Sequence, residues 1–176
     1  MKTLLLSVLS LILVGTLNAQ QGAKTTKRNV EVNKRIDNKV AYNYFLLDMI
    51  RDIDVVYGEY EELIQRAWSK RIDLDLKGSS GDYLKRIDAI GQTVEEMPIF
   101  KGGDDYQKSV LEYTDVVKEK ITLLERYGIL GTIPDSDINE YNDAEIAFNE
   151  ATNKGIEVRN KVRKLKSSFE KKTYIQ

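Results

Sequence analysis

The chain of 176 residues contains no cysteine and no histidine. Without cysteine it has no thiol nucleophile, no disulfide and no thiolate metal site. Without histidine it lacks the imidazole that serine–histidine triads and HExxH zinc sites require. These absences exclude many hydrolytic and metalloenzyme chemistries. We therefore expect a non-enzymatic protein, and we predict no catalytic residue, no metal site and no cofactor.

Neither sign of charge is in excess, because 27 Lys and Arg residues face 28 Asp and Glu residues. Proline occurs only twice, at Pro98 and Pro134, and both prolines interrupt helical periodicity. Hydrophobic residues make up 41% of the chain. This composition and length are typical of one folded domain with a core of its own.

The first nineteen residues have the pattern of a secretory signal peptide. Lys2 supplies a positive charge, an apolar stretch runs from Leu4 to Val14, and Ala19 is a small residue suited to cleavage. The apolar stretch is too short to span a bilayer, which takes about 20 residues. We therefore expect residues 1–19 to be removed, residues 20–28 to form a flexible leader, and residues 29–176 to form the domain of an exported protein that is not an integral membrane protein.

Four segments repeat apolar residues at steps of three and four, which is the periodicity of amphipathic helices. They cover residues 29–68, 81–97, 104–127 and 136–171. Gly128 is expected to end the third helix, and Ser80 to cap the second. The pattern predicts an all-α fold, an antiparallel up-down-up-down four-helix bundle with long first and fourth helices. Residues 69–80 are expected to be extended, with their Ile and Leu side chains on the bundle.

Helix length and charge together predict a basic stalk. The surplus length of the first and fourth helices places residues 29–43 beside residues 155–171, and basic residues dominate both stretches. This stalk is either a solvated helical face or a surface that contacts an anionic envelope polymer, acidic lipid headgroups or an acidic protein. Nucleic acid is not an expected partner. The candidate contact residues are Lys34, Arg35, Arg159, Lys161, Arg163, Lys164 and Lys166.

Tyrosine is over-represented among the aromatic residues, with ten Tyr against four Phe and one Trp. Most of these tyrosines follow the apolar stripes, where a ring fills core volume while its hydroxyl reaches the rim. The alternative is a groove that binds a glycan or a peptide. Tyr42 and Tyr44 are expected on the exposed side of the first helix. The candidate groove residues are Tyr42, Tyr44, Tyr57 and Tyr60.

Acidic residues offer one weak resemblance to a metal site. Asp135, Asp137 and Asn139 alternate as in the first half of a calcium loop, but Glu140 stands at the position of the required glycine and Ile146 at that of the final glutamate. Capping of the fourth helix by Asp137 and Glu140 is the simpler interpretation.

Three short segments resemble a family of uncharacterised exported bacterial surface proteins that are described only as helical. They are Val40–Asn43, Phe100–Gly102 with Tyr106–Lys120 after it, and Ile138–Asn142 with Phe148–Ala151 after it. The resemblance implies a helical fold and export. It implies no activity, cofactor or functional residue. Many members of that family resemble lipoproteins, whereas this chain has no cysteine to carry a lipid.

Two functional hypotheses follow. The first is an exported, non-enzymatic interaction module of unknown partner that uses the basic stalk. The second is a bundle that binds a small molecule, a glycan or a metal in a pocket between its helices.

Overall fold

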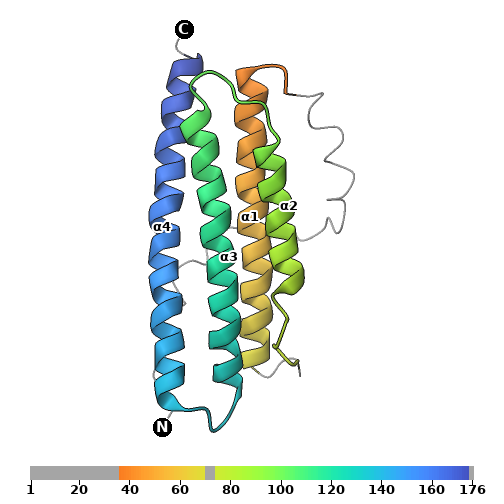
Figure 1. The fold of residues 1–176 in the computed structure, drawn as a ribbon, viewed down its shortest axis with the longest axis vertical. Coiled ribbons are helices and arrows are strands. Elements are labelled where there is room, and N and C mark those ends of the chain that lie inside the picture. The colour runs from red at the N-terminus through yellow and green to blue at the C-terminus, as the bar shows by residue number, and fades with distance from the viewer. Residues whose placement is uncertain (1–35, 70–73, 175–176) are drawn as a thin grey trace.

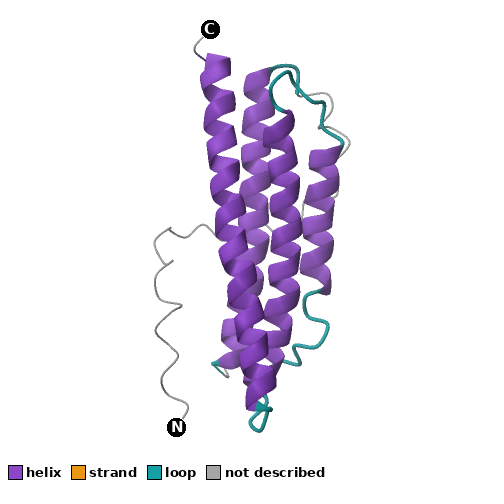
Figure 2. Ribbon diagram, turned by 60° about the vertical axis from the view of Figure 1, so that its left-hand side comes forward, coloured by secondary structure: helices purple, strands orange, loops and turns teal. Residues whose placement is uncertain are grey.

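The computed structural model describes residues 36–69 and 74–174, and these residues form four helices and no strand. The helices are α1 (Lys39–Trp68), α2 (Gly81–Glu95), α3 (Asp104–Thr132) and α4 (Ile138–Tyr174). They lie side by side with their long axes nearly aligned, as in a helix bundle (Figures 1 and 2). The prediction of an all-helical fold is confirmed for the described residues. Residues 1–35, which include the predicted signal peptide and leader, lie outside them.

Local sequence signals explain where three of these helices begin. The Asn38 side chain accepts a hydrogen bond from the Ala41 N–H at 2.9 Å, which caps the start of α1. Asp137 does the same for α4, accepting from the Asn139 N–H at 2.7 Å. Gly78 adopts a φ of 76° in the turn before α2, a conformation that a residue with a side chain rarely adopts. The α2 helix starts after Ser80, as predicted, although the Ser80 side chain makes no capping bond.

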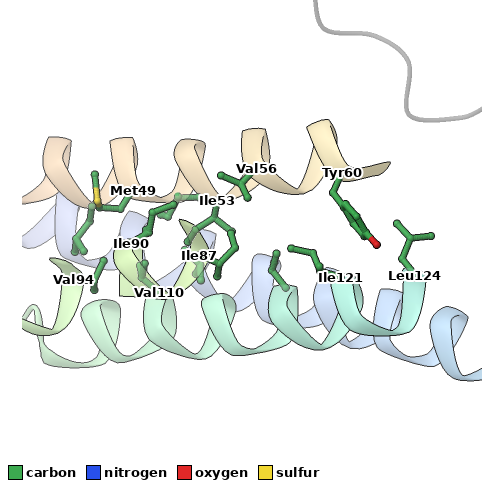
Figure 3. Close-up of a cluster of buried hydrophobic side chains, with 14 of the residues drawn as sticks. Met49, Ile53, Val56, Tyr60, Ile87, Ile90, Val94, Val110, Ile121 and Leu124 are labelled. Atoms are coloured by element: carbon green, nitrogen blue, oxygen red, sulfur yellow. The ribbon is translucent and has the colours of Figure 1, made fainter. Parts of the chain in front are cut away.

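The core is a continuous apolar cluster between the four helices. Figure 3 shows side chains of α1, α2 and α3 converging on one another, with Ile53, Ile87 and Val110 near the centre. Each of these three side chains is fully buried. The connection after α1 adds Leu76, which is also buried, whereas Leu74 is largely exposed. The expectation that the Ile and Leu side chains of residues 69–80 pack on the bundle therefore holds for Leu76 but not for Leu74.

The third helix is longer than predicted, because Gly128 lies inside it and does not end it. A Cβ atom at Gly128 would lie 3.1 Å from Ile64 Cδ1 and 3.3 Å from Leu76 Cδ1. Glycine therefore gives α1 and the following connection room to pack closely against α3. With 29 residues, α3 is nearly as long as α1, which has 30.

The predicted two-helix stalk is wrong for the described residues. The α1 helix begins at Lys39, so only its first turns coincide with the expected stalk. The α4 side of that stalk packs against α3, because Val162 and Phe169 are buried and the Phe169 ring lies 6.1 Å from the Tyr106 ring. The basic part of α4 therefore belongs to the body of the bundle.

Candidate functional site

The basic residues of α4 divide into those that bind neighbouring helices and those that face solvent. Arg159 belongs to the first group: its guanidinium donates to Asp54 of α1 at 2.7 Å and lies 5.4 Å from the centre of the Tyr113 ring. Tyr113 donates its hydroxyl proton to the other oxygen of Asp54 at 2.7 Å. Arg159 therefore joins α1, α3 and α4, and it is not a free contact residue.

Three lysines of α4 are paired with acids. Lys154 binds Glu119 at 2.7 Å and Lys161 binds Glu112 at 2.5 Å, so both connect α4 to α3. Lys166 binds Glu170 within α4 at 2.8 Å. Sequence reasoning missed both inter-helix pairs. The sequence does contain a pattern that matches these pairs. Glu112 and Glu119 are seven residues apart on α3, and Lys154 and Lys161 are seven residues apart on α4.

The remaining cations lie within the last turns of α4. Arg163, Lys164, Lys171 and Lys172 are exposed, and no carboxylate of the described residues forms a salt bridge with them. Arg163 makes only a long hydrogen bond of 3.5 Å to Asn160. We call these four residues the basic end of α4. Lys34 and Arg35, the other candidate contact residues, lie outside the described residues.

An open surface hollow of about 500 Å³ adjoins the basic end of α4. Lys164 lies on its rim and Leu165 supplies an apolar surface. The remaining lining residues are Glu157, Asn160 and Lys161. Its lining holds two lysines and one carboxylate, that of Glu157. Such an open hollow suits an extended anionic ligand better than a small molecule, because an open site does not enclose its ligand.

The structure does not bring the four candidate groove tyrosines together. Tyr42 and Tyr60 are fully buried, Tyr57 is partly buried, and Tyr44 is 61% exposed. The expectation that Tyr42 lies on the exposed side of α1 is therefore wrong. Its hydroxyl donates to Gln107 Oε1 at 2.8 Å, deep between α1 and α3. Tyr60 instead faces Tyr83 of α2, with ring centres 4.9 Å apart.

Burial dominates the electrostatics of these tyrosines. It raises the pKa of Tyr60 to about 12, with the hydrogen bond to Ser79 acting in the opposite direction. The pKa of Tyr42 is also raised, first by burial and then by the charge of Asp104. These hydroxyls consequently stay neutral at physiological pH, which suits core packing and provides no base or nucleophile.

Lys120 is a partly buried cation that the sequence analysis did not single out. Its ammonium lies 3.8 Å above the centre of the Tyr57 ring, and burial lowers its pKa. Tyr57 donates a long hydrogen bond to Glu61 at 3.4 Å, and burial, followed by the charge of Glu61, raises the Tyr57 pKa. These groups fill the contact between α1 and α3, and neither open hollow of the described residues is lined by them.

Carboxylates do not converge on a metal position in the described parts of the chain, where no group of three or more potential ligands comes together. Asp137 is engaged in capping α4. A second open hollow of about 380 Å³ lies along the later part of α3, between Glu125, Ile129 and Glu140 among others. None of the described helices has the length and apolar character needed to cross a bilayer.

Comparison of the chain with family models, with curated proteins and with solved structures finds no match in any of the three.

Proposed function

We propose that the protein is an exported, non-enzymatic interaction module whose basic end of α4 contacts an anionic partner. The observation that carries this proposal is the cluster of four exposed cations within ten residues of one helix, at Arg163, Lys164, Lys171 and Lys172. Other basic residues of α4 are used for contacts inside the bundle, whereas these four remain available. Export rests on the signal-like pattern of residues 1–19.

The partner chemistry is that of an extended polyanion, such as an acidic envelope polymer. Successive cations along a helix end match repeated negative charges, and the open hollow beside Lys164 can accept a chain without enclosing it. Cations at a helix C-terminus also interact favourably with the helix dipole. The two roles differ in their consequences, because dipole stabilisation acts on folding whereas polyanion contact acts on binding.

The up-down-up-down order of the helices is part of this proposal. The start of α3 lies beside the end of α4, where Tyr106 contacts Phe169, and the end of α3 lies beside the start of α4, where Tyr127 contacts Tyr141. The start of α1 meets the start of α3 through Tyr42 and Gln107. Such an order keeps the basic end of α4 at the end of the bundle where α1 and α3 begin.

The alternative function, a ligand pocket between the helices, has less support. Both hollows described above are open, and the interior between α1, α2 and α3 is occupied by apolar side chains (Figure 3). We therefore place the contact surface on the outside of the bundle.

Charge reversal at the basic end tests the proposal. We expect Arg163→Glu with Lys164→Glu to abolish retention on immobilised dextran sulfate at low ionic strength, and to abolish salt-sensitive capture by intact cell envelopes. The matched control is Arg66→Glu with Lys77→Glu, which makes the same charge change at two exposed residues near the end of α1 and in the connection after it, away from the end of α4. If both double variants bound the polyanion equally weakly, the binding would depend only on the net charge of the protein. That result would refute the proposal of a defined contact surface.

A further inference from the structure

The solvent side of α4 carries an uncharged row of asparagine and isoleucine. The row consists of Asn142, Ile146, Asn149, Asn153, Ile156 and Asn160, which we call the Asn/Ile stripe. Consecutive members are four or three residues apart in strict alternation, so they follow one line along the helix. All six residues are exposed, and the two isoleucines are 56% and 53% exposed.

The stripe is unlike the exposed side of the neighbouring helix. Along α3 the exposed residues Lys108, Glu112, Asp115 and Glu119 are charged, as is usual for a solvated helix, and the row then reaches the uncharged Thr122. The stripe has no charge at any of its six positions, in a chain in which 31% of residues are charged. Among the described residues, no side chain pairs with the amides of Asn142, Asn149 or Asn153.

The order of residues in the stripe is a palindrome. Read from either end, it is Asn-Ile-Asn-Asn-Ile-Asn. A two-fold axis between Asn149 and Asn153 therefore places Ile146 of one copy against Ile156 of a second copy. The same axis places asparagine against asparagine at the other four positions. An interface between identical subunits related by a two-fold axis must be self-complementary, and this stripe meets that condition.

Charge outside the stripe favours opposed helix directions. The start of α4 carries the acids Glu140 and Asp143, and no base precedes Lys154 in this helix. In the two-fold arrangement, Arg163 and Lys164 of one copy come within about one helical turn of these acids in the other copy. A parallel pairing would instead bring acid beside acid and base beside base.

The position of α4 leaves the stripe accessible. This helix lies at one edge of the bundle, beside α3, with its other side turned outward (Figure 1). Lys154 and Lys161, which follow Asn153 and Asn160 of the stripe directly in sequence, bind Glu119 and Glu112 of α3. The stripe lies beyond them, away from the core.

We propose that two copies of the protein associate through the Asn/Ile stripes of their α4 helices, in opposite directions and with a two-fold axis between residues 149 and 153. The contact contains only two pairs of isoleucine, and Glu150 lies close to its own counterpart across the axis. Interfaces of this small size are weak. We therefore expect dimers to form at roughly 100 µM and above.

Cysteine cross-linking tests this geometry directly, because the chain contains no native cysteine. Ile146→Cys and Ile156→Cys are purified separately and then oxidised alone or as a mixture. We expect a disulfide-linked dimer in the mixture only, because two copies of residue 146 lie about 15 Å apart in the proposed pair. Cross-linking of Ile146→Cys alone to the same extent would indicate parallel or random contact, and no cross-link in the mixture would refute the proposal.

The matched control replaces one partner by Val55→Cys, which is comparably exposed but lies on α1. Its mixture with Ile156→Cys is expected to give no dimer above the level of random collision. A dimer yield equal to that of the Ile146→Cys mixture would overturn the proposal.

Sedimentation equilibrium gives a second measurement that needs no cysteine. We expect the unaltered protein to dimerise at about 100 µM and above, and Ile146→Glu with Ile156→Glu to weaken association at least tenfold. Val55→Glu with Ile99→Glu alters two exposed hydrophobic residues elsewhere and is expected to leave association unchanged. An unaltered protein that is monomeric at 1 mM would refute the interface, whatever the outcome for polyanion binding.

Discussion

The two ends of the bundle are held by different kinds of contact. At the end where α1 and α3 begin, which we call the Gln107 end, buried side chains form directional hydrogen bonds. Gln107 accepts from Tyr42 at 2.8 Å and donates to the Val94 carbonyl at 2.7 Å and the Met97 carbonyl at 3.3 Å. A single amide therefore joins α1, the end of α2 and the start of α3.

The opposite end, which we call the Trp68 end, depends on the fit of aromatic rings. Trp68 meets Tyr127 edge-on with ring centres 4.9 Å apart, and Tyr127 stacks on Phe148 at 5.8 Å. The indole N–H of Trp68 donates to the Gly128 carbonyl at 2.9 Å. A Cβ atom at Gly131 would come within 2.6 Å of that indole nitrogen.

The comparison shows that the two ends of one bundle can be held in place by different physical means. Hydrogen bonds fix the Gln107 end because buried polar groups must find partners. Steric fit fixes the Trp68 end because a large ring occupies space that glycine leaves open. Two buried polar atoms at the Gln107 end, Asn43 Oδ1 and Tyr106 Oη, have no hydrogen-bond partner among the described residues.

The largest effect is expected from Gln107→Met. Methionine has nearly the same volume, but it removes the amide that bonds the Tyr42 hydroxyl and two carbonyls, and it leaves that hydroxyl only the longer contact of 3.2 Å with the Gly103 carbonyl. We expect a loss of about 3 kcal/mol in the free energy of unfolding, measured by urea denaturation. Gln92→Met, at an exposed site in α2, is expected to have little effect. A loss below about 1 kcal/mol would show that these hydrogen bonds do not define this end.

Gly131→Ala should have an intermediate effect at the Trp68 end. The added methyl group must displace the Trp68 ring, and the strain outweighs the higher helix propensity of alanine by about 1–2 kcal/mol. Fluorescence of Trp68, which is the single tryptophan, is expected to shift as the ring moves. Gly58→Ala is the control, because a Cβ there meets nothing within 4 Å, and it should stabilise the protein. Stabilisation by Gly131→Ala would contradict the steric account.

The smallest effect is expected from Glu170→Gln at the Gln107 end. The hydrogen bond from Lys166, and then that from Asn43, lower the pKa of Glu170 below its ordinary value of 4.5. A carboxylate with a lowered pKa stabilises the folded state above its unfolded pKa, and this contribution is lost as the pH falls. The unaltered protein should therefore be more stable than the variant by about 0.5 kcal/mol at pH 7, and by less at pH 3.

Urea denaturation at both pH values measures this difference. Glu157→Gln serves as the control, because Glu157 is exposed on α4 and forms no salt bridge with the described residues. A difference in the free energy of unfolding between the unaltered protein and Glu170→Gln that is as large at pH 3 as at pH 7 would show that charge is not its cause.

The sequence predicts the helices well because apolar periodicity directly reflects which side of a helix is buried. The end of α1 at Trp68 and the starts of α2 and α3 agree with prediction. The error at Gly128 arises because a glycine that ends a helix and a glycine that permits close packing look alike in sequence. Only the neighbouring Ile64 and Leu76 distinguish them.

The burial of the candidate tyrosines is harder to predict, because the first helix contains two overlapping rows of apolar residues at helical spacing. One repeat passes through Val40 and Leu47, and the other through Tyr42, Leu46 and Met49. The structure buries the second, and Val40 is 39% exposed. The choice depends on distant residues, because Gln107, sixty-five positions away, and the Gly103 carbonyl supply the acceptors that allow the Tyr42 hydroxyl to be buried. Likewise, the roles of Arg159 and Lys161 depend on which acids of α1 and α3 face them.

The near alignment of the four helix axes has a consequence for spectroscopy (Figure 1). Backbone N–H bonds in an α-helix lie along its axis, so most amide N–H bonds in the described helices are nearly parallel or antiparallel to one common axis. With α4 alone about 55 Å long, the molecule should rotate more slowly end over end than about its long axis. Amide nitrogens in the helices should therefore have closely similar transverse relaxation rates. The rates of amide nitrogens in the connections should differ from these values.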